Sequence, residues 1–495
     1  MDIEDYTGSP SLLNETYRLN YERLKRTIVS DIEKNSRFTG FLRERFGRNK
    51  IKMMIKHPEK NVREIRALSR YLYIVSSHYR RLINYFAQIM MYNYNVVPGE
   101  ALTRNPSKTK YKKDFMWVVN FGEKYNLKTE AEKMIKICMR DGVAIGIFQE
   151  SNNSQSAYIV PLEPRYMRIK SIEDGCFIPS IDLSRLNQFN IGDYPTDVQR
   201  AYEQYREDPT PKKRFYEFKN GVAILADDTQ PFLWMPPFGN LLLDVADLED
   251  AKAIQRQRDE QSNYKVLSAK VETDDEGEPK MPFSQIQQYY EQMSGELPDG
   301  IGLLLSPFTV NDHSFQDNAS NDRDAAIAAS NSFWNSAGMS SALMGGGNVT
   351  TASAMLIAVK PDEAIAFSLL KQFERCLNRR IKKKNLNYLF KIKFLYQSIF
   401  NSSDVRDSLA KAAQYGLPVK MEYASSLGYT PSEILGSTYL EETILGLATE
   451  SWMHPLVSSN TQSYTDSEGG RPSESITEIS DTGIQTRDSD ANANR

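Results

Sequence analysis

The histidines and cysteines of this chain are the first side chains to consider for metal or acid–base chemistry. None of the four histidines lies at metal-ligand spacing from another or from a cysteine: His57, His78, His313 and His454. The three cysteines are odd in number and widely spaced, which fits neither a disulfide framework nor a zinc site: Cys138, Cys176 and Cys376. We expect structural histidines, reduced core thiols and no metal.

Clusters of acidic residues could instead gather Mg²⁺ for nuclease chemistry. There are three such clusters: Asp244/Asp247/Asp250, Asp274/Asp275/Glu276 and Asp322/Asp324. The first and third stand at predicted helix starts, where carboxylates complement the helix dipole, and the second stands in a predicted turn. We therefore expect all three clusters to be structural.

A glycine-rich segment at 345–351 could cradle phosphates. It lacks the lysine that a Gly-x-x-x-x-Gly-Lys-Ser/Thr loop places on the phosphates, so we expect a mobile loop between two helices. The Gly-x-Ser-x-Gly sequence of many hydrolases is also absent from the chain. The sequence thus predicts a protein that is not an enzyme and that needs no cofactor.

The elements that carry these residues must form more than one structural unit, because 495 residues exceed what one core usually supports. The composition, 40% hydrophobic and 25% charged, is that of a folded protein. No apolar stretch is long enough to span a bilayer, and the N-terminus is acidic where a signal peptide would be basic. We expect a protein of the cytosol with no membrane contact.

Charge is distributed unevenly although the net charge is only −3. Segment 457–495 holds seven acids and three arginines, and its polar composition predicts a disordered acidic tail. Residues 18–56 hold twelve lysines and arginines against four acids, and residues 375–393 are also strongly basic. These clusters could face nucleic acid, or they could be solvated helix faces.

The pattern of apolar residues predicts an α+β fold in which helices predominate. Apolar spacing predicts helices over 11–95, with one long amphipathic helix at its end, and over 108–140. Alternation and turn residues predict short strands from 143 to about 235. A helix is predicted from 241 to about 265, but its second half, 255–263, is almost wholly polar. That half must face water or other subunits, because it has no apolar stripe to bury.

The second half of the chain is predicted to continue as an insert, long helices and a small C-terminal part. Strands near 266–271 and 301–305 and a short helix near 284–293 form the insert. A small-residue helix starts near 321, and another runs from about 352 to 383 with Pro361 inside it, which predicts a kink. A strand over 388–395 and helices near 404–414 and 431–448 complete the ordered chain.

This order of elements resembles the portal proteins of tailed bacteriophages, particularly those of long-tailed phages that infect Gram-positive bacteria. The likeness covers roughly residues 60–456 and lies in the order of several short stretches: 141–144, 161–166, 338–345, 372–378, 393–395 and 400–401. The resemblance implies a portal-type fold with wing, stem, clip and crown parts. Its boundaries would be 1–240 wing, 241–263 first stem helix, 264–316 clip, 317–342 second stem helix, 343–354 tunnel loop, 355–385 kinked wing helix, 386–456 wing and crown, and 457–495 tail.

The resemblance also implies which residues serve the channel and the docking surface. The tunnel loop would be Gly345, Gly346, Gly347, Asn348, Val349, Thr350 and Thr351. Candidate cations facing the channel are Arg256, Arg258, Lys360, Lys371, Arg379, Arg380, Lys382, Lys383 and Lys384. Clip residues that would dock partners are Glu276, Glu278, Lys280, Gln285 and Gln288.

The function that the resemblance implies is a homo-oligomeric ring, typically of twelve subunits, around a channel for DNA packaging and ejection. Implied partners are further copies of the chain, double-stranded DNA bound without sequence preference, the terminase large subunit, the major capsid and scaffolding proteins, and a head–tail adaptor. The ring would be assembled in the host cytoplasm and located at a capsid vertex of the virion. Two alternatives stay open: a metal-dependent DNA-packaging nuclease, and a head–tail adaptor or capsid structural protein without a channel.

Overall fold

The computed structural model describes residues 47–101, 106–150, 157–188, 191–248, 265–270, 301–306, 319–339, 341–344 and 352–447, with residues 285 and 292 between them. The chain divides into two units, residues 1–434 and 435–495. Helices predominate and several small sheets accompany them, so the predicted α+β class is confirmed. None of the described helices is long and apolar enough to cross a membrane.

The helical N-terminal part is broken where the sequence predicts one long helix. It consists of α3 (Arg48–Lys56), α4 (Pro58–Val75) and α5 (Ser77–Gln88). Ser76 has an extended backbone, and its side chain accepts a hydrogen bond from the Tyr79 N–H at the start of α5. The chain then enters a strand, β1 (Tyr94–Pro98), so the predicted helical stretch ends too late.

The helical stretch predicted near 108–140 is present but is divided into two helices, and glycine geometry fixes the end of the second. They are α6 (Lys108–Tyr125) and α7 (Leu127–Asp141), separated by Asn126 in the left-handed region. The cap of α7 is Gly142, with φ +80°. A Cβ atom at Gly142 would lie 2.4 Å from the Met235 backbone, so only glycine fits this turn.

The β-rich region forms two antiparallel sheets of three strands each. The first has the order β3-β2-β7 and the second the order β4-β5-β6. Their strands are β2 (Val143–Glu150), β3 (Ala157–Leu162), β4 (Met167–Glu173), β5 (Cys176–Asp182), β6 (Phe215–Glu217) and β7 (Gly221–Leu225). Between β5 and β6 lies α8 (Thr196–Glu207), which the sequence patterns missed. Short turns of 3₁₀ helix are η1 (Pro164–Tyr166), η2 (Leu183–Arg185), η3 (Ile191–Asp193) and η4 (Gly239–Leu241).

The helix predicted from Leu241 begins as expected and is described as far as residue 248. Its polar second half lies outside the described residues. The two predicted strands of the insert are present as β8 (Lys265–Lys270) and β9 (Ile301–Ser306), and they pair in parallel.

The C-terminal half contains the longest helix of the chain that the structure describes, α12 (Ala352–Lys382). Before it come α11 (Ala319–Ser336) and η5 (Ser341–Met344). After it come β10 (Phe390–Phe394), α13 (Ser402–Gln414), α14 (Lys420–Ser426), α15 (Pro431–Thr438) and the π-helical η6 (Tyr439–Ile444). The sequence patterns missed η5 and α14, and they predicted one helix over 431–448 where the structure has α15 followed by η6.

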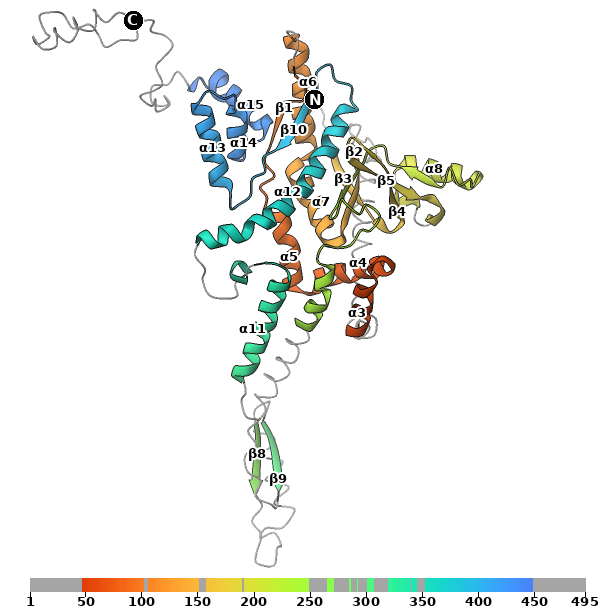
Figure 1. The fold of residues 1–495 in the computed structure, drawn as a ribbon, viewed down its shortest axis with the longest axis vertical. Helices are drawn as coiled ribbons and strands as arrows, with labels where there is room; N and C mark the ends of the chain where they lie inside the picture. The colour runs from red at the N-terminus through yellow and green to blue at the C-terminus, as the bar shows by residue number, and fades with distance from the viewer. Residues whose placement is uncertain are drawn as a thin grey trace, which may run out of the picture. The chain divides into compact units, whose positions relative to one another are not determined.

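The hydrophobic core gathers around the second half of α12. Leu369, Phe373 and Leu377 on this helix are buried, and α12 packs against β5, β7 and β10 (Figure 1). The strand β10 pairs with β1, with Tyr94 opposite Phe394. This pair joins the N-terminal part of the chain directly to its C-terminal part. Helices α5 and α7 complete the packing.

A buried carboxylate joins the N-terminal helices to the sheets. Asp141, at the end of α7, has a side chain that is 1% exposed, and it accepts two hydrogen bonds each from Arg70 and Arg140 at 2.8–3.0 Å. Arg70 also donates to Glu163 at 2.7 Å. The Arg66 side chain donates to the backbone carbonyls of Asp141 and Trp234. Four segments distant in sequence are therefore fixed around one charge.

Burial alone would raise the pKa of Asp141, but the two arginines outweigh it and lower that pKa to about 2. Because the folded pKa lies below the ordinary value for a carboxyl group, the ion pairs contribute stability at all pH values above that ordinary value. This contribution is lost as the pH falls through about 2. As the pH falls, Asp141 should therefore be protonated only after the exposed and weakly paired carboxylates have been protonated.

Replacing this carboxylate tests its importance for stability. We expect Asp141→Asn to lower the free energy of unfolding by about 3–5 kcal/mol near neutral pH, because two partly buried cations lose their shared partner. Urea unfolding followed by circular dichroism measures the change. Glu163→Gln is the matched control, because its side chain is 40% exposed and should cost less than about 1 kcal/mol. Equal costs for the two variants would contradict this account of the junction.

Candidate functional site

The described residues hold no group of three or more histidine, cysteine, aspartate or glutamate side chains that could bind a metal ion. The three cysteines are free and buried. Cys138 lies within hydrogen-bonding distance of the Ile224 carbonyl, and Cys376 within that of the Ala223 carbonyl. Burial raises the pKa of the Cys138 thiol, which further disfavours a reactive thiolate.

Polar side chains on α12 tie this helix to two strands. The side-chain amide of Gln372 donates to the Leu225 carbonyl and accepts from the Leu225 N–H, both at 2.9 Å, at the free edge of β7. Asn378 forms the same pair of bonds with Ile392 on β10, also at 2.9 Å. Each amide thus replaces one residue of a missing neighbouring strand.

Glu374 lies between these two amides and accepts a hydrogen bond from the Phe394 N–H at 2.8 Å. Burial raises the pKa of Glu374 above its ordinary value. The three side chains fall in the 372–378 stretch that carries part of the family likeness, and their task in this chain is structural. The sequence carried no signal that separates these three from the other polar residues of α12.

The predicted channel cations at the end of α12 are paired with acids of the sheets. Arg379 and Lys383 both donate to Glu173, and Lys382 donates to Asp174 at 2.6 Å, in the turn between β4 and β5. Their hydrogen bonds lower the pKa of Glu173. These pairs hold the end of α12 against the β4–β5 turn.

Two further cations of this tract contact aromatic rings. Arg380 donates to Glu150 and lies 5.0 Å from the Phe148 ring centroid, and the Lys384 ammonium lies 5.8 Å from the Trp117 ring. The structure therefore brings the cations of 379–384 to partners within the chain. Their predicted place in a channel stays a prediction.

The remaining predicted cations differ in their surroundings. Lys360 has a side chain that is 62% exposed and lies 3.8 Å from Glu363. Lys371 lies 5.3 Å from the ring of Tyr396. Arg256 and Arg258 lie outside the described residues, as does the whole predicted tunnel loop at 345–351. Of the predicted clip residues only Gln285 is described, and it is exposed.

Helix α5 holds both flanks of the glycine-rich segment. On the N-terminal flank, Arg81 Nη1 donates to the carbonyl of Met344 at 3.1 Å. On the C-terminal side, within α12 and just after Pro361, the hydroxyl of Tyr85 donates to Asp362 Oδ2 at 3.0 Å. Burial raises the pKa of Asp362 above its ordinary value. The two anchors are one helical turn apart on α5, so Met344 and Asp362 are both held on the same part of this helix.

The end of α11 is anchored on the same helix. Phe333 and Trp334 are buried, and their rings lie 6.2 and 5.7 Å from the imidazole of His78 on α5. The sequence predicts the small-residue helix that carries them, but it gives no sign that these two rings have a partner on α5. In the structure they fix the return of the chain from the insert onto α5.

The first half of α12 exposes large apolar side chains. Leu356, Ile357 and Ile365 are 44%, 72% and 48% exposed, whereas Val359 and Ala366 are fully buried. Pro361 lies within the helix, as predicted. Figure 1 shows α12 changing direction along its length, which agrees with the missing backbone donor of a proline.

No protein-family model matches the chain, and no curated protein matches it. Several solved structures resemble the chain at low sequence identity. They include the neck of an empty gene transfer agent (GTA) particle, with 13% identity, a TM-score of 0.45, and 72% of this chain and 94% of that chain covered. A native GTA virion gives 12% identity, a TM-score of 0.43 and the same coverages.

An HK97-family phage portal protein from Corynebacterium diphtheriae gives 12% identity and a TM-score of 0.30, with 65% of this chain and 93% of that chain covered. All three TM-scores lie below 0.5. The function proposed below therefore rests on the residues of this chain.

The amide bonds of α12 make a prediction about stability. We expect Asn378→Leu to lower the free energy of unfolding by about 2–3 kcal/mol, because the Ile392 N–H and C=O both lose their partner. Urea unfolding measures this loss. Gln414→Leu replaces an exposed amide at the end of α13 and should change stability by less than about 0.5 kcal/mol. A loss of that small size for Asn378→Leu would show that the strand edge does not need the amide.

Proposed function

We propose that this chain is a portal-type subunit, which forms a homo-oligomeric ring around a channel for double-stranded DNA at a virion vertex. The observation that carries the proposal is that α5 anchors one described residue on each side of segment 345–351, Met344 and Asp362. We expect these anchors to bring the segment to an equivalent place in every copy of the chain. Around a ring axis, such copies form a collar of equivalent segments.

The composition of the segment suits a collar through which DNA slides. Its side chains are small, amide or hydroxylated, and it contains no lysine or arginine. Cations would bind the phosphate backbone and release counterions, which holds DNA in place. A surface without cations gives weak contact that does not depend on sequence, so DNA can pass.

Self-association is supported by apolar surface that the chain leaves uncovered. Ile357 on α12 and Ile327 on α11 are 72% and 57% exposed, although both belong to helices that flank the proposed collar segment. Large exposed aliphatic side chains at such a place are typical of subunit interfaces. Contact with equivalent helices of neighbouring copies would bury them.

The finer parts of the proposal follow the family likeness. We assign a ring of about twelve subunits, a wing that meets capsid and scaffolding proteins, and a clip at 264–316 that docks terminase and later the head–tail adaptor. The ring assembles in the host cytoplasm and acts without catalysis. A metal-dependent nuclease and an adaptor without a channel are the two rival functions, and the experiments below separate them.

The oligomeric state of the purified full-length chain tests the ring. We expect a mass near twelve subunits by size-exclusion chromatography with light scattering, and ring-shaped particles in negative stain. The variant Ile357→Asp should yield smaller species with an unchanged circular dichroism spectrum, because a charge cannot be buried unpaired in an interface. Met53→Asp is the control, since Met53 is similarly exposed, at 58%, but lies on α3. A monomer that cleaves DNA with Mg²⁺ would end the proposal.

Deletion of residues 345–351 tests the collar itself. Rings should still assemble, because the exposed faces of α11 and α12 remain, but DNA packaging should fall by at least about tenfold. Packaged DNA protected from nuclease provides the measurement. Packaging at the normal level by assembled deletion rings would argue against a collar role for this segment.

A further inference from the structure

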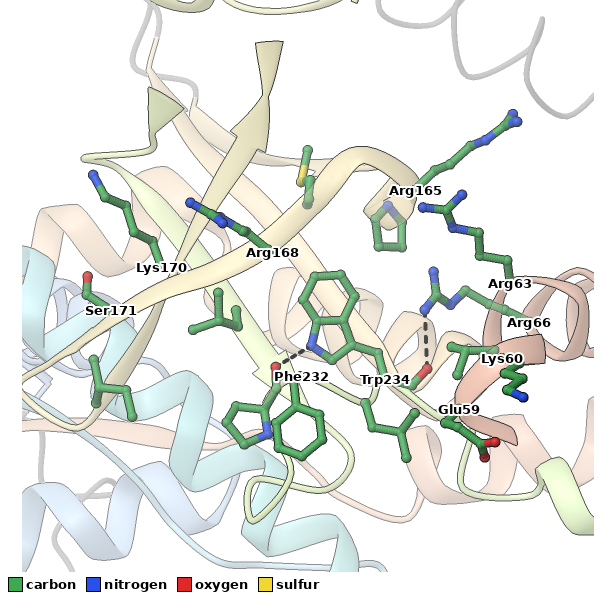
Figure 2. A pocket seen from close by; sticks show the side chains of 17 residues that line it. Glu59, Lys60, Arg63, Arg66, Arg165, Arg168, Lys170, Ser171, Phe232 and Trp234 are labelled. Atoms are coloured by element: carbon green, nitrogen blue, oxygen red, sulfur yellow. Dashed lines mark hydrogen bonds between the residues drawn. The ribbon is translucent and has the colours of Figure 1, made fainter. Parts of the chain in front are cut away.

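A groove lies between α4 and the edge of the second sheet, on residues that the proposed function does not use. It is a cavity of about 710 Å³, and its walls come from α4, from η1 and β4, and from the segment 231–234. Figure 2 shows Lys60, Arg63 and Arg66 on one side and Arg168 and Lys170 on the other, with Trp234 between them.

The groove is strongly basic. Six cations line it against one acid, Glu59: Lys60, Arg63, Arg66, Arg165, Arg168 and Lys170. Lys170 has a carboxylate partner, Glu217, at 3.1 Å, and Arg66 is committed to backbone carbonyls. Among the residues that the structure describes, no acidic side chain forms an ion pair with Lys60, Arg63 or Arg165. These three cations leave the groove with uncompensated positive charge.

One wall of the groove is an unpaired strand edge. In its sheet β4 has only β5 as a neighbour, and six consecutive residues of β4, 167–172, line the groove. Side chains of a strand alternate between faces, and the register shift between Ile169 and Ser171 interrupts this alternation only at Lys170, so a cavity that touches six residues in a row follows the edge and not one face. Such an edge offers backbone donors and acceptors to an extended chain.

The register of the sheet shows which backbone groups point to this edge. Ile169 lies opposite Pro179, whose carbonyl accepts a hydrogen bond from Phe218 on the β6 side. Pro179 therefore turns its backbone away from β4, and the pair is of the type without hydrogen bonds. It follows that the N–H and C=O of Ile169 point away from β5, towards the free edge.

Apolar side chains complete the groove. Phe232 and Ile172 are 83% and 62% exposed at its rim. Trp234 is nearly buried, and its indole N–H donates to the Pro231 carbonyl at 2.8 Å, so its ring is held in place. A ligand that satisfies the groove must therefore offer negative charge, a backbone able to pair with a strand, and apolar side chains.

We propose that this groove binds an extended acidic peptide segment of a partner protein, which adds a strand to the free edge of β4. Carboxylates of the peptide pair with Arg63 and Arg165, its backbone pairs with Ile169, and its apolar side chains cover Phe232. Nucleic acid offers the charge but has no backbone N–H and C=O ladder for the strand edge. The site stands apart from α5 and α12, so it holds whether or not the chain forms a conduit.

A designed peptide tests the groove on the full-length chain. The probe is a fluorescent peptide as long as β4, seven residues, that alternates glutamate with valine, and fluorescence anisotropy measures its affinity. The double variant Arg63→Glu, Arg165→Glu should weaken binding by at least about tenfold, because two charge-assisted contacts become repulsive. Lys112→Glu, an exposed cation on α6, is the matched control and should change the affinity by less than about twofold.

A second experiment tests whether the peptide pairs with the strand edge through its backbone. The same peptide with alternate amides N-methylated keeps every charge but loses the edge hydrogen bonds, so its affinity should fall by about tenfold. The proposal is overturned if methylation has no effect, if Lys112→Glu weakens binding as much as the double variant, or if single- or double-stranded DNA displaces the peptide at equal concentration of charge. Unchanged thermal unfolding of the variants shows that they fold.

Discussion

A buried carboxylate between two arginines is the constraint on which the rest of this structure depends. Transferring Asp141 from water costs several kcal/mol unless its charge is matched, and Arg70 and Arg140 match it with hydrogen bonds at both oxygens. The same junction fixes Arg66, which holds the carbonyl of Trp234. One charge cluster thus determines how α4 lies against the sheets, and with it the width of the basic groove.

A second constraint lies in α12, which serves two purposes along its length. Its second half is bound to the edges of β7 and β10 through Gln372 and Asn378, and its end is bound to the β4–β5 turn through Arg379. Its first half has apolar side chains that the chain does not cover, such as Ile357. Because the helix is fixed at one end, contacts made by the proposed interface on its other half would cost little further conformational entropy.

Sequence patterns predicted those parts of the fold that depend on local rules. Alternation and the Asp174-Gly175 turn predicted β4 and β5, and Pro361 was placed correctly within a helix. The break at Ser76 was missed, because the apolar spacing continues across it and only the cap bond to Tyr79 reveals the stop. β1 was missed because its partner, β10, is provided by the far end of the chain.

For the candidate site, the sequence identified the glycine-rich segment and the basic tract but not what holds them. The pairing of Lys382 with Asp174, and of Arg81 with the Met344 carbonyl, joins residues whose distance in sequence leaves no local signal. The basic groove was missed for the same reason, since its cations come from separate helices and strands. Charge counts along the chain cannot show which cations are already neutralised.

The pairing of β1 with β10 has a consequence for the order in which the chain folds during synthesis. Tyr94 leaves the ribosome long before Phe394, so β1 and the helices around it wait without their partner until the chain is nearly finished. Contacts between such distant residues also form slowly, because a large loop must close first. A product truncated before Phe390 would therefore lack the partner of β1 and a completed core.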